Sequence, residues 1–271
     1  MPNAKYIVTG EGKISFEDTG GDGVPVVCVP GMGDLRSVYR FVTCDLNRKG
    51  YRVITMDLRG MGDSTVKWQD YSESSIALDI VSLINQLELK SVILIGNSIS
   101  AGAAVILSAQ HPELISKVVL VSPFVRNVHI PRSKRLLFRL ALAKPWGASV
   151  WARYQSSNLY PSMKPPDMET YSLSVKTMLR QKGRLKAFQK MAATGHSKAE
   201  ESVDHMKVPA MVVMGSKDTD FPDPKKELDW VAVRTGAKSV MIEGVGHYPQ
   251  AECPGKFIAY LTDFIGDSSA A

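Results

Sequence analysis

Three side chains of types that together perform nucleophilic catalysis each follow a short apolar run. Ser98 comes after the run KSVILIG, Asp218 after VPAMVVMG, and His247 after KSVMIEG. A histidine activates a serine hydroxyl by accepting its proton, and a carboxylate orients that histidine and stabilises its charged form. These residue types, in the order Ser, Asp, His along the chain, predict a catalytic triad for acyl transfer.

The residues around Ser98 have the spacing of a nucleophile elbow, a tight strand-to-helix turn that raises a serine hydroxyl above a sheet. Such a turn needs small neighbours because the strand and helix backbones pass close together, and Gly96, Ser100 and Gly102 meet this need. Ser100 replaces the second glycine of the usual G-x-S-x-G pattern. Taken alone, the segment also fits a turn in which the serine only caps the following helix.

Two further carboxylates compete with Asp218 as the partner of His247. Asp220 and Asp223 lie in the same loop, and either could cap a helix that begins after Pro224. We favour Asp218 because it comes first after the predicted strand.

Neither a metal nor a nucleotide cofactor is expected. The remaining histidines share no metal-like spacing with a carboxylate, and we expect them to face solvent or to pack against neighbours. They are His111, His129, His196 and His205. Gly31-Met32-Gly33 is too short for a dinucleotide fingerprint, and no phosphate-binding loop motif is present. The three cysteines lack CxxC spacing, so neither a disulfide framework nor a zinc site is suggested.

The pattern of the chain predicts the element that positions these side chains. Six Val- and Ile-rich runs of strand length alternate with segments of helical period, which is typical of a mainly parallel sheet. The runs are residues 24–30, 51–57, 90–96, 117–123, 208–215 and 238–244. Ahead of them, alternating residues around Gly10-Glu11-Gly12 predict an antiparallel hairpin at the sheet edge. Apolar residues at helical spacing predict a helix over residues 76–87. Ser98, Asp218 and His247 should therefore converge where the parallel strands end.

The strand-helix alternation is interrupted between about residues 124 and 207. This segment contains no convincing strand and is far longer than an ordinary connection, so we expect an inserted helical cap. The predicted organisation is a core over 1–124, a cap over 125–206 and a core over 207–271. The expected cap helices are Arg132 to Ala143 and Glu169 to Ala193, with Pro161, Pro165 and Pro166 marking the turn between them.

Length and composition set the outer limits. With 271 residues and 44% hydrophobic content, the chain can bury one large core. Its N-terminus lacks the basic and apolar segments of a secretory signal, and no run approaches the roughly 18 apolar residues that span a bilayer. A cytoplasmic protein is expected.

The net charge of +6 is unevenly distributed along the chain. Residues 124–205 contain 15 Lys and Arg against 5 Asp and Glu, so the rest of the chain is slightly acidic. The segment SKRLLFRLALA is both cationic and apolar, as a membrane-surface helix or an entrance for acidic or acyl substrates would be. We favour a lid helix whose apolar face roofs the pocket while its charges face water. Clustered aromatic residues for base stacking are absent, which argues against nucleic acid.

With these motifs in view, the sequence resembles an α/β-hydrolase over nearly its whole length. Residues 57–64, DLRGMGDS, resemble the D-x-R-G-x-G-x-S turn of this family, and Pro30-Gly31-Met32-Gly33 occupies the place of its His-Gly oxyanion turn. The resemblance implies a mainly parallel, eight-stranded α/β-hydrolase sheet with helices on both faces and an inserted α-helical cap. It also implies that backbone N–H groups of Met32 and Ile99 hold the oxyanion, and that no cofactor takes part.

The expected activity is hydrolysis of a small or medium carboxylic ester or lactone through an acyl-enzyme on Ser98. One alternative is hydrolytic C–C cleavage of a diketone-like substrate, because Asn97 resembles that subgroup, although Tyr248 stands where that subgroup often has tryptophan. Another is a slow-turnover small-molecule receptor or signalling protein with the same fold. The PGMG segment and the S-x-S of the elbow in this chain are similar to sequences in such receptors. The expected partner is a small apolar or acyl molecule.

Overall fold

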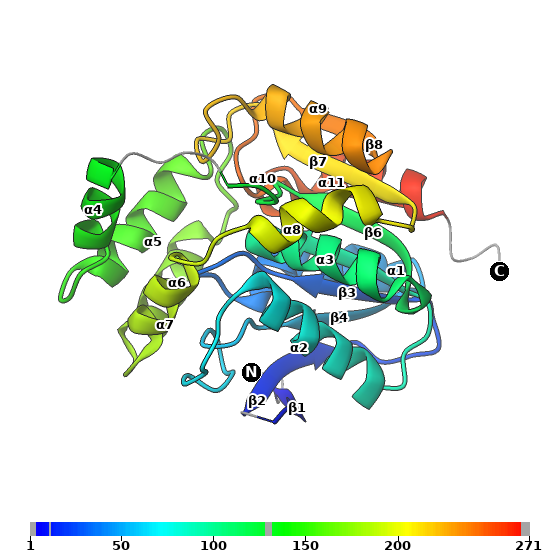
Figure 1. The fold of residues 1–271 in the computed structure, drawn as a ribbon, viewed down its shortest axis with the longest axis horizontal. Helices are drawn as coiled ribbons and strands as arrows, with labels where there is room; N and C mark the ends of the chain where they lie inside the picture. The colour runs from blue at the N-terminus through cyan, green and yellow to red at the C-terminus, as the bar shows by residue number, and fades with distance from the viewer. Residues whose placement is uncertain (1–3, 11, 128–131, 267–271) are drawn as a thin grey trace.

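The computed structural model describes residues 4–10, 12–127 and 132–266. Its centre is an eight-stranded sheet with the strand order β1-β2-β4-β3-β5-β6-β7-β8 (Figure 1). The strands are β1 Lys5–Val8, β2 Lys13–Asp18, β3 Pro25–Val29, β4 Arg52–Met56, β5 Val92–Asn97, β6 Ile115–Val121, β7 Ala210–Gly215 and β8 Lys238–Ile242. Each of the six predicted runs overlaps one of the strands β3 to β8; β5 ends one residue after its run, and β6 begins two residues before its run.

Pairing within the sheet is mostly parallel. Strands β3 to β8 run parallel to one another, whereas β1 and β2 pair antiparallel and attach to β4. The backbone N–H of Thr9 donates to the Gly12 carbonyl at 2.8 Å, which closes the predicted hairpin; Glu11 lies outside the described residues. Strands β5 and β7 are buried throughout, as expected for central strands covered on both faces. The predicted fold class is confirmed.

Helices cover both faces of the sheet (Figure 1). Helix α1 (Arg40–Arg48) packs with α11 (Pro254–Ile265), and α2 (Glu73–Gln86) packs with α3 (Ile99–Gln110) on the opposite face. The predicted helix over residues 76–87 corresponds to α2, which buries Ile76, Ile80, Leu83 and Ile84. The remaining core helices are α9 Pro224–Thr235 and α10 Pro249–Glu252, and three short 3-10 turns are η1 Arg36–Tyr39, η2 Pro112–Leu114 and η3 Val203–His205.

Among the described residues, five α-helices lie in the segment between β6 and β7. They are α4 Arg132–Ala141, α5 Gly147–Asn158, α6 Met168–Arg180, α7 Arg184–Met191 and α8 Ser197–Ser202. Helices α4 to α7 project at one end of the sheet, while α8 lies against α3 (Figure 1). The prediction of a helix starting at Arg132 is confirmed, although α4 ends two residues earlier than expected.

The single helix predicted over residues 169–193 was wrong, because the structure divides this span into α6 and α7. Gly183 separates them with a φ of 90°, and a Cβ there would lie 2.7 Å from Cγ1 of Val66. Only glycine adopts this conformation readily, so the chain turns at this point instead of continuing as a helix. The structure also adds α5, which the sequence analysis had not predicted.

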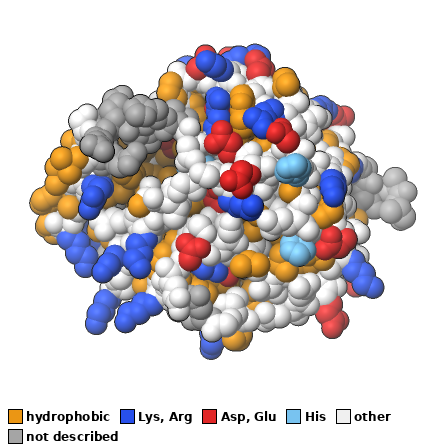
Figure 2. Space-filling view, in the orientation of Figure 1, with side chains coloured by type: hydrophobic (Ala, Val, Ile, Leu, Met, Phe, Trp, Pro, Cys, Tyr) orange, Lys and Arg blue, Asp and Glu red, His pale blue; other side chains and the backbone are white. Residues whose placement is uncertain are grey.

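The apolar side chains of α4 differ from the expected roof of a pocket. Leu136, Leu137, Phe138 and Leu140 are exposed instead of turned onto the core. In Figure 2 hydrophobic side chains gather at the left edge of the molecule, where α4 lies in Figure 1, and basic side chains gather beside and below them. Within the described residues, no helix has the length and apolar character needed to cross a membrane.

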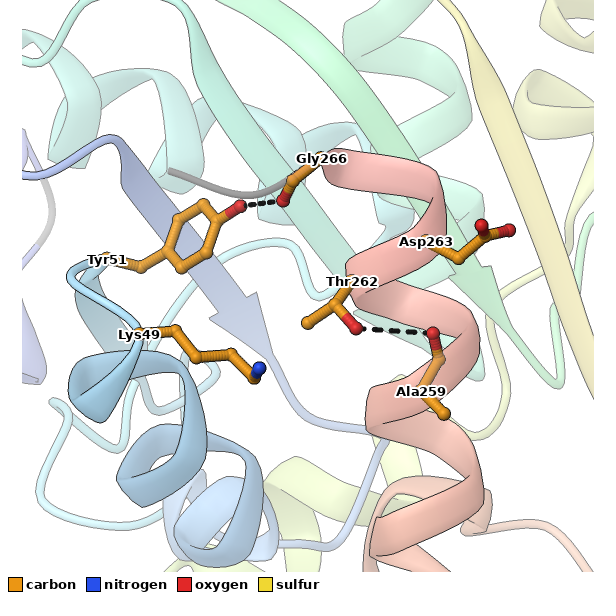
Figure 3. Close-up of a pocket in the computed structure, with 6 residues that line it drawn as sticks. All are labelled: Lys49, Tyr51, Ala259, Thr262, Asp263 and Gly266. Atoms are coloured by element: carbon orange, nitrogen blue, oxygen red, sulfur yellow. Dashed lines mark hydrogen bonds between the residues drawn. The ribbon is translucent and has the colours of Figure 1, made fainter. Parts of the chain in front are cut away.

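A shallow hollow of about 360 Å³ lies at the amino ends of the strands, between the end of α1 and α11. In Figure 3, Lys49 and Tyr51 lie across it from Thr262, and the Tyr51 hydroxyl donates to the Gly266 carbonyl. A second hollow of about 440 Å³ lies near the end of α3 and the start of η3. Neither hollow is lined by Ser98, Asp218 or His247.

Candidate active site

Ser98 occupies the turn between β5 and α3 in a strained backbone conformation. Its φ and ψ are 59° and −123°, a region that residues other than glycine rarely adopt and that occurs preferentially at functional sites. A Cβ on Gly96 would lie 2.4 Å from the Ser100 carbonyl oxygen, which explains the need for glycine there. The Ser98 side chain makes no helix-capping hydrogen bond. The turn therefore has elbow geometry, and the interpretation of Ser98 as a simple helix cap fails.

Ser100, the departure from the usual elbow pattern, has a definite structural role. Its fully buried hydroxyl donates to the carbonyl of Pro30 at 2.5 Å. Pro30 begins residues 30–33, hereafter the PGMG turn. Pro30 stands where the oxyanion turn of the family has histidine, so two departures from the family pattern, Pro30 and Ser100, are joined by this bond. This hydrogen bond fixes the PGMG turn against the elbow.

The PGMG turn lies against the nucleophile. A Cβ on Gly31 would lie 3.1 Å from the Ser98 Cβ, so only glycine leaves normal packing distances here. Ile99 is the first residue of α3, where backbone N–H groups have no partner within the helix. The N–H groups expected to hold an oxyanion, those of Met32 and Ile99, therefore belong to segments that flank Ser98.

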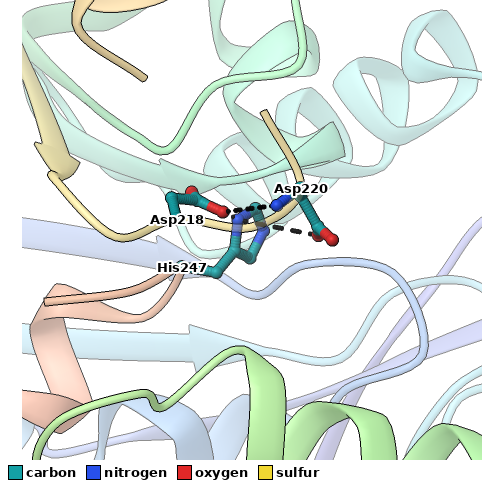
Figure 4. A group of neighbouring side chains, drawn as sticks. All are labelled: Asp218, Asp220 and His247. Atoms are coloured by element: carbon teal, nitrogen blue, oxygen red, sulfur yellow. Dashed lines mark hydrogen bonds and ion pairs between the residues drawn. The ribbon is translucent and has the colours of Figure 1, made fainter. Parts of the chain in front are cut away.

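His247 and Asp218 form a direct, buried pair. Nδ1 of His247 lies 2.8 Å from Oδ2 of Asp218, and each residue is 2% exposed (Figure 4). Burial disfavours the charged imidazolium, but the negative charge of Asp218 and its hydrogen bond outweigh this effect. Together with other nearby acids, they raise the pKa of His247 to about 9. The imidazolium is thus the main form at neutral pH, and the basic imidazole accumulates as the pH rises.

Asp220 and Asp223, the two alternatives to Asp218 as the partner of His247, lie in different environments. Asp220 lies second-nearest to the histidine, with Oδ2 at 3.8 Å from Nδ1 of His247, and it accepts a 2.5 Å hydrogen bond from the Tyr154 hydroxyl. Burial raises the pKa of Asp220, the charge of His247 opposes this shift, and the charge of Asp218 adds to it. Asp223 instead caps α9, since its side chain accepts from the Lys226 N–H at 3.0 Å.

The two aspartates and His247 are also close enough to be considered as cation ligands. One ligand atom from each lies within 4.8 Å of the others. Hydrogen bonds already account for one oxygen on each carboxylate, through His247 on Asp218 and through Tyr154 on Asp220. Hydrogen bonding therefore explains the cluster without a metal.

Asn97 and Phe124 connect the elbow to the histidine loop. The Asn97 amide donates to the carbonyls of Val121 at 3.2 Å and His247 at 3.3 Å. The Phe124 N–H donates to the Ser98 carbonyl at 3.2 Å, and its ring lies 5.8 Å from the His247 ring. These contacts hold the backbone of the elbow beside the loop that carries the imidazole.

Helix α5 contacts both halves of this arrangement. Nε1 of Trp151 donates to the Gly33 carbonyl at 3.0 Å, and Tyr154 donates to Asp220. Just after the helix, the Leu159 carbonyl accepts from the backbone N–H of His247 at 3.1 Å. These residues could not be predicted from the sequence, because nothing in their own spacing relates them to the candidate triad. Only their contacts in the folded structure do so.

Asp34, just after the PGMG turn, is a further acidic group that the sequence analysis missed. It is fully buried and accepts from the Tyr171 hydroxyl and from the Leu35 N–H. Burial raises the pKa of Asp34 to about 6, against the opposing effect of these hydrogen bonds. Its charge also contributes to the raised pKa of His247. In the sequence, only its position two residues after Met32 indicated that Asp34 would lie near the site.

The remaining histidines lie outside the triad. His196 bonds to the buried Glu73 at 2.7 Å and stacks on Phe124, whereas His205 is exposed. His111 pairs with Glu113 near the surface at 3.2 Å. His129 lies outside the described residues. The expectation that these side chains pack or face solvent holds for the three that are described.

The chain matches the model of a known protein family over most of its length. The model described as "Alpha/beta hydrolase family" matches residues 26–260. The chain belongs to this family. An uncharacterized protein, Rv2715 of Mycobacterium tuberculosis, is 24% identical over 93% of this chain and 78% of its own length. Putative esterase/lipase 2 of Mycoplasma pneumoniae is 24% identical over 87% of this chain and 86% of its own length.

Solved structures show the same fold. An esterase, EaEST, from Exiguobacterium antarcticum superposes with a TM-score of 0.81 at 20% identity, over 94% of this chain and 96% of that one. Family membership supports the sequence prediction that the protein is a hydrolase. The bond that it cleaves is a separate question, which depends on the site itself.

The two side chains expected to react, Ser98 and His247, are both buried. Each is only 2% exposed.

Proposed function

We propose that this hydrolase cleaves small or medium carboxylic esters or lactones through an acyl-enzyme on Ser98. The observation that carries the proposal is the buried His247–Asp218 hydrogen bond beside a serine held at a φ of 59°. The imidazole is oriented through Nδ1, which leaves Nε2 as the atom that can accept the serine proton. A serine activated in this way attacks a carbonyl carbon, and this acyl transfer involves no change of oxidation state.

In the proposed reaction, the Ser98 oxygen bonds to the carbonyl carbon while its proton moves to His247. The negative charge that develops on the carbonyl oxygen is held by the N–H groups of Met32 and Ile99, and each such donor contributes about 3 kcal/mol in related enzymes. The alcohol then leaves with the proton from His247. A water molecule repeats the sequence on the acyl-enzyme, which releases the acid and restores the serine.

The C–C cleavage alternative receives no specific support. The Asn97 side chain, which suggested it, is engaged by the carbonyls of Val121 and His247. Tyr248, at the second position of interest, stacks on Tyr160 at 5.1 Å between ring centres. These contacts give Asn97 and Tyr248 structural roles that would serve an esterase as well as a C–C hydrolase, so they do not favour C–C cleavage.

The test is hydrolysis of p-nitrophenyl butyrate by the wild-type protein and by Ser98→Ala, with Ser108→Ala as the control. Ser108 lies on α3, the helix that follows Ser98. Its buried hydroxyl has no partner among the described residues, so its loss should leave turnover unchanged. Loss of the nucleophile should reduce kcat by at least about 10³-fold. A fluorophosphonate should also label Ser98, identified by peptide mass.

Two outcomes would overturn the proposal. Turnover that survives in Ser98→Ala would assign the chemistry to another group. Ligand-induced thermal stabilisation of a wild-type protein with no turnover would instead favour the receptor alternative.

A further inference from the structure

Helix α4 presents a cluster of large apolar side chains to solvent. Leu136 is 57% exposed, Leu137 67%, Phe138 40% and Leu140 56%, and Trp146 in the turn before α5 is 52% exposed. We call these five residues the α4 patch. In the space-filling view the hydrophobic side chains form a continuous band along this edge of the molecule (Figure 2).

Among the described residues, the other helices of the cap leave this patch exposed. Helices α5 and α6 bury their own apolar side chains, such as Trp151 and Val175, against each other and the core. Leu142, just beyond α4, is buried, and it anchors only the end of the helix. A ten-residue helix is marginal in water without packing, and a large exposed apolar patch marks an interaction site. A partner surface would supply the missing contact.

The charge around the patch identifies the kind of surface. The α4 sequence RSKRLLFRLA contains four basic residues and no acidic residue. Arg139 and Lys144 are exposed, and neither forms an ion pair with any residue that the structure describes. Unpaired positive charge beside exposed leucine, phenylalanine and tryptophan is complementary to an anionic lipid surface, in which headgroup phosphates lie above acyl chains.

A second copy of the chain fits the patch less well. In a symmetric dimer the same patch faces itself, so the basic residues of the two α4 helices would be brought together. Like charges at close range oppose such an interface. The composition therefore favours lipid over self-association.

We propose that the α4 patch lies on anionic lipid, with its leucines and Phe138 among the acyl chains and with Arg139 and Lys144 at the headgroup phosphates. The contact is peripheral, at the bilayer surface. It does not depend on the bond that the enzyme hydrolyses.

The test is co-sedimentation of the full chain with vesicles of phosphatidylcholine, alone or mixed equally with phosphatidylglycerol. An apolar variant combines Leu137→Gln and Leu140→Gln. Its matched control combines Leu78→Gln and Val233→Gln, which change exposed apolar side chains on α2 and α9. A charge variant combines Arg139→Glu and Lys144→Glu, with Lys90→Glu and Lys256→Glu as its control at other exposed positions.

The wild-type protein and both controls should sediment with the mixed vesicles and weaken as salt is added. Each basic residue removed should weaken binding by about fivefold, and the apolar variant should lose at least about tenfold. Thermal melting verifies that the variants are folded, which exposed substitutions should permit.

Three results would overturn the proposal: a wild-type protein that stays in the supernatant, binding lost equally in the variants and their controls, or a dimer that the apolar variant abolishes without any vesicle binding. Fluorophosphonate labelling of Ser98 in lipid-free buffer reports on the proposed function separately. Loss of labelling with retained sedimentation counts against the esterase alone, and the reverse result counts against the lipid surface alone.

Discussion

Replacement of Asp220 by asparagine should move the pH profile of this hydrolase to lower pH. The Asp220 carboxylate lies 3.8 Å from Nδ1 of His247, and its negative charge helps to hold the pKa of the imidazole at about 9. Removing that charge makes the imidazolium easier to deprotonate. The basic form needed to accept the Ser98 proton then accumulates at lower pH.

The size of the shift follows from the distance. Two unit charges 3.8 Å apart interact by about 4 kcal/mol at an effective dielectric constant of about 20, and by about 1 kcal/mol in water. One pKa unit corresponds to about 1.4 kcal/mol. Since Tyr154 already satisfies one oxygen of this carboxylate, we expect a shift between these limits, of about 1 to 3 units.

The assay is kcat/KM for p-nitrophenyl butyrate between pH 5 and 10, because its acidic limb reports the pKa of the free enzyme's base. The limb should lie near 9 in the wild-type protein. Asp263→Asn is the control, since Asp263 is an exposed carboxylate at the opposite edge of the sheet. A limb that stays in place in Asp220→Asn, or that moves upward, would refute the electrostatic reasoning.

Three further substitutions test other contacts. Tyr154→Phe removes the hydrogen bond that lowers the pKa of Asp220, so Asp220 should carry less charge and the kcat/KM limb should move to lower pH, by less than in Asp220→Asn; an upward shift would contradict this. Ser100→Ala leaves the first carbonyl of the PGMG turn without its partner and should cost about 1 to 3 kcal/mol in urea unfolding and lower kcat, whereas Ser108→Ala should cost less. Arg59→Met removes the cationic partner of the buried Asp79 carboxylate and should lower the free energy of unfolding by about 3 to 5 kcal/mol; a loss below about 1 kcal/mol would show that the 2.8 Å pair is not stabilising.

The sheet was predictable because its signal is local. Each run of Val and Ile is both a strand and a buried surface, so composition alone locates it, and regular alternation with helices gives the parallel order. The positions of the candidate triad residues were predictable for a related reason. Ser98, Asp218 and His247 all follow strands, and the carboxyl ends of those strands meet at one edge.

The cap was harder to predict because its helices are defined by packing. Helix α5 contains Gly147 and three serines, and its buried Trp151 and Gln155 give no clear apolar stripe. Gly183 lies between two helices and forms the N-cap of α7 through its left-handed backbone conformation, a role that the helical residues on either side conceal in the sequence. Contacts such as Tyr154 with Asp220 join residues 66 positions apart, and no pattern within either segment announces them.

The backbone hydrogen bond from His247 to Leu159 has a consequence for engineering. Exchange of caps between relatives is an attractive way to change specificity in a fold of this kind. In this protein an exchanged segment that includes α5 and Leu159 would replace the residue whose carbonyl anchors the histidine loop, together with the helix that bonds to Gly33. A transplanted α5 would have to arrive together with the loop after β8, whereas α4, with few contacts to either, could be replaced alone.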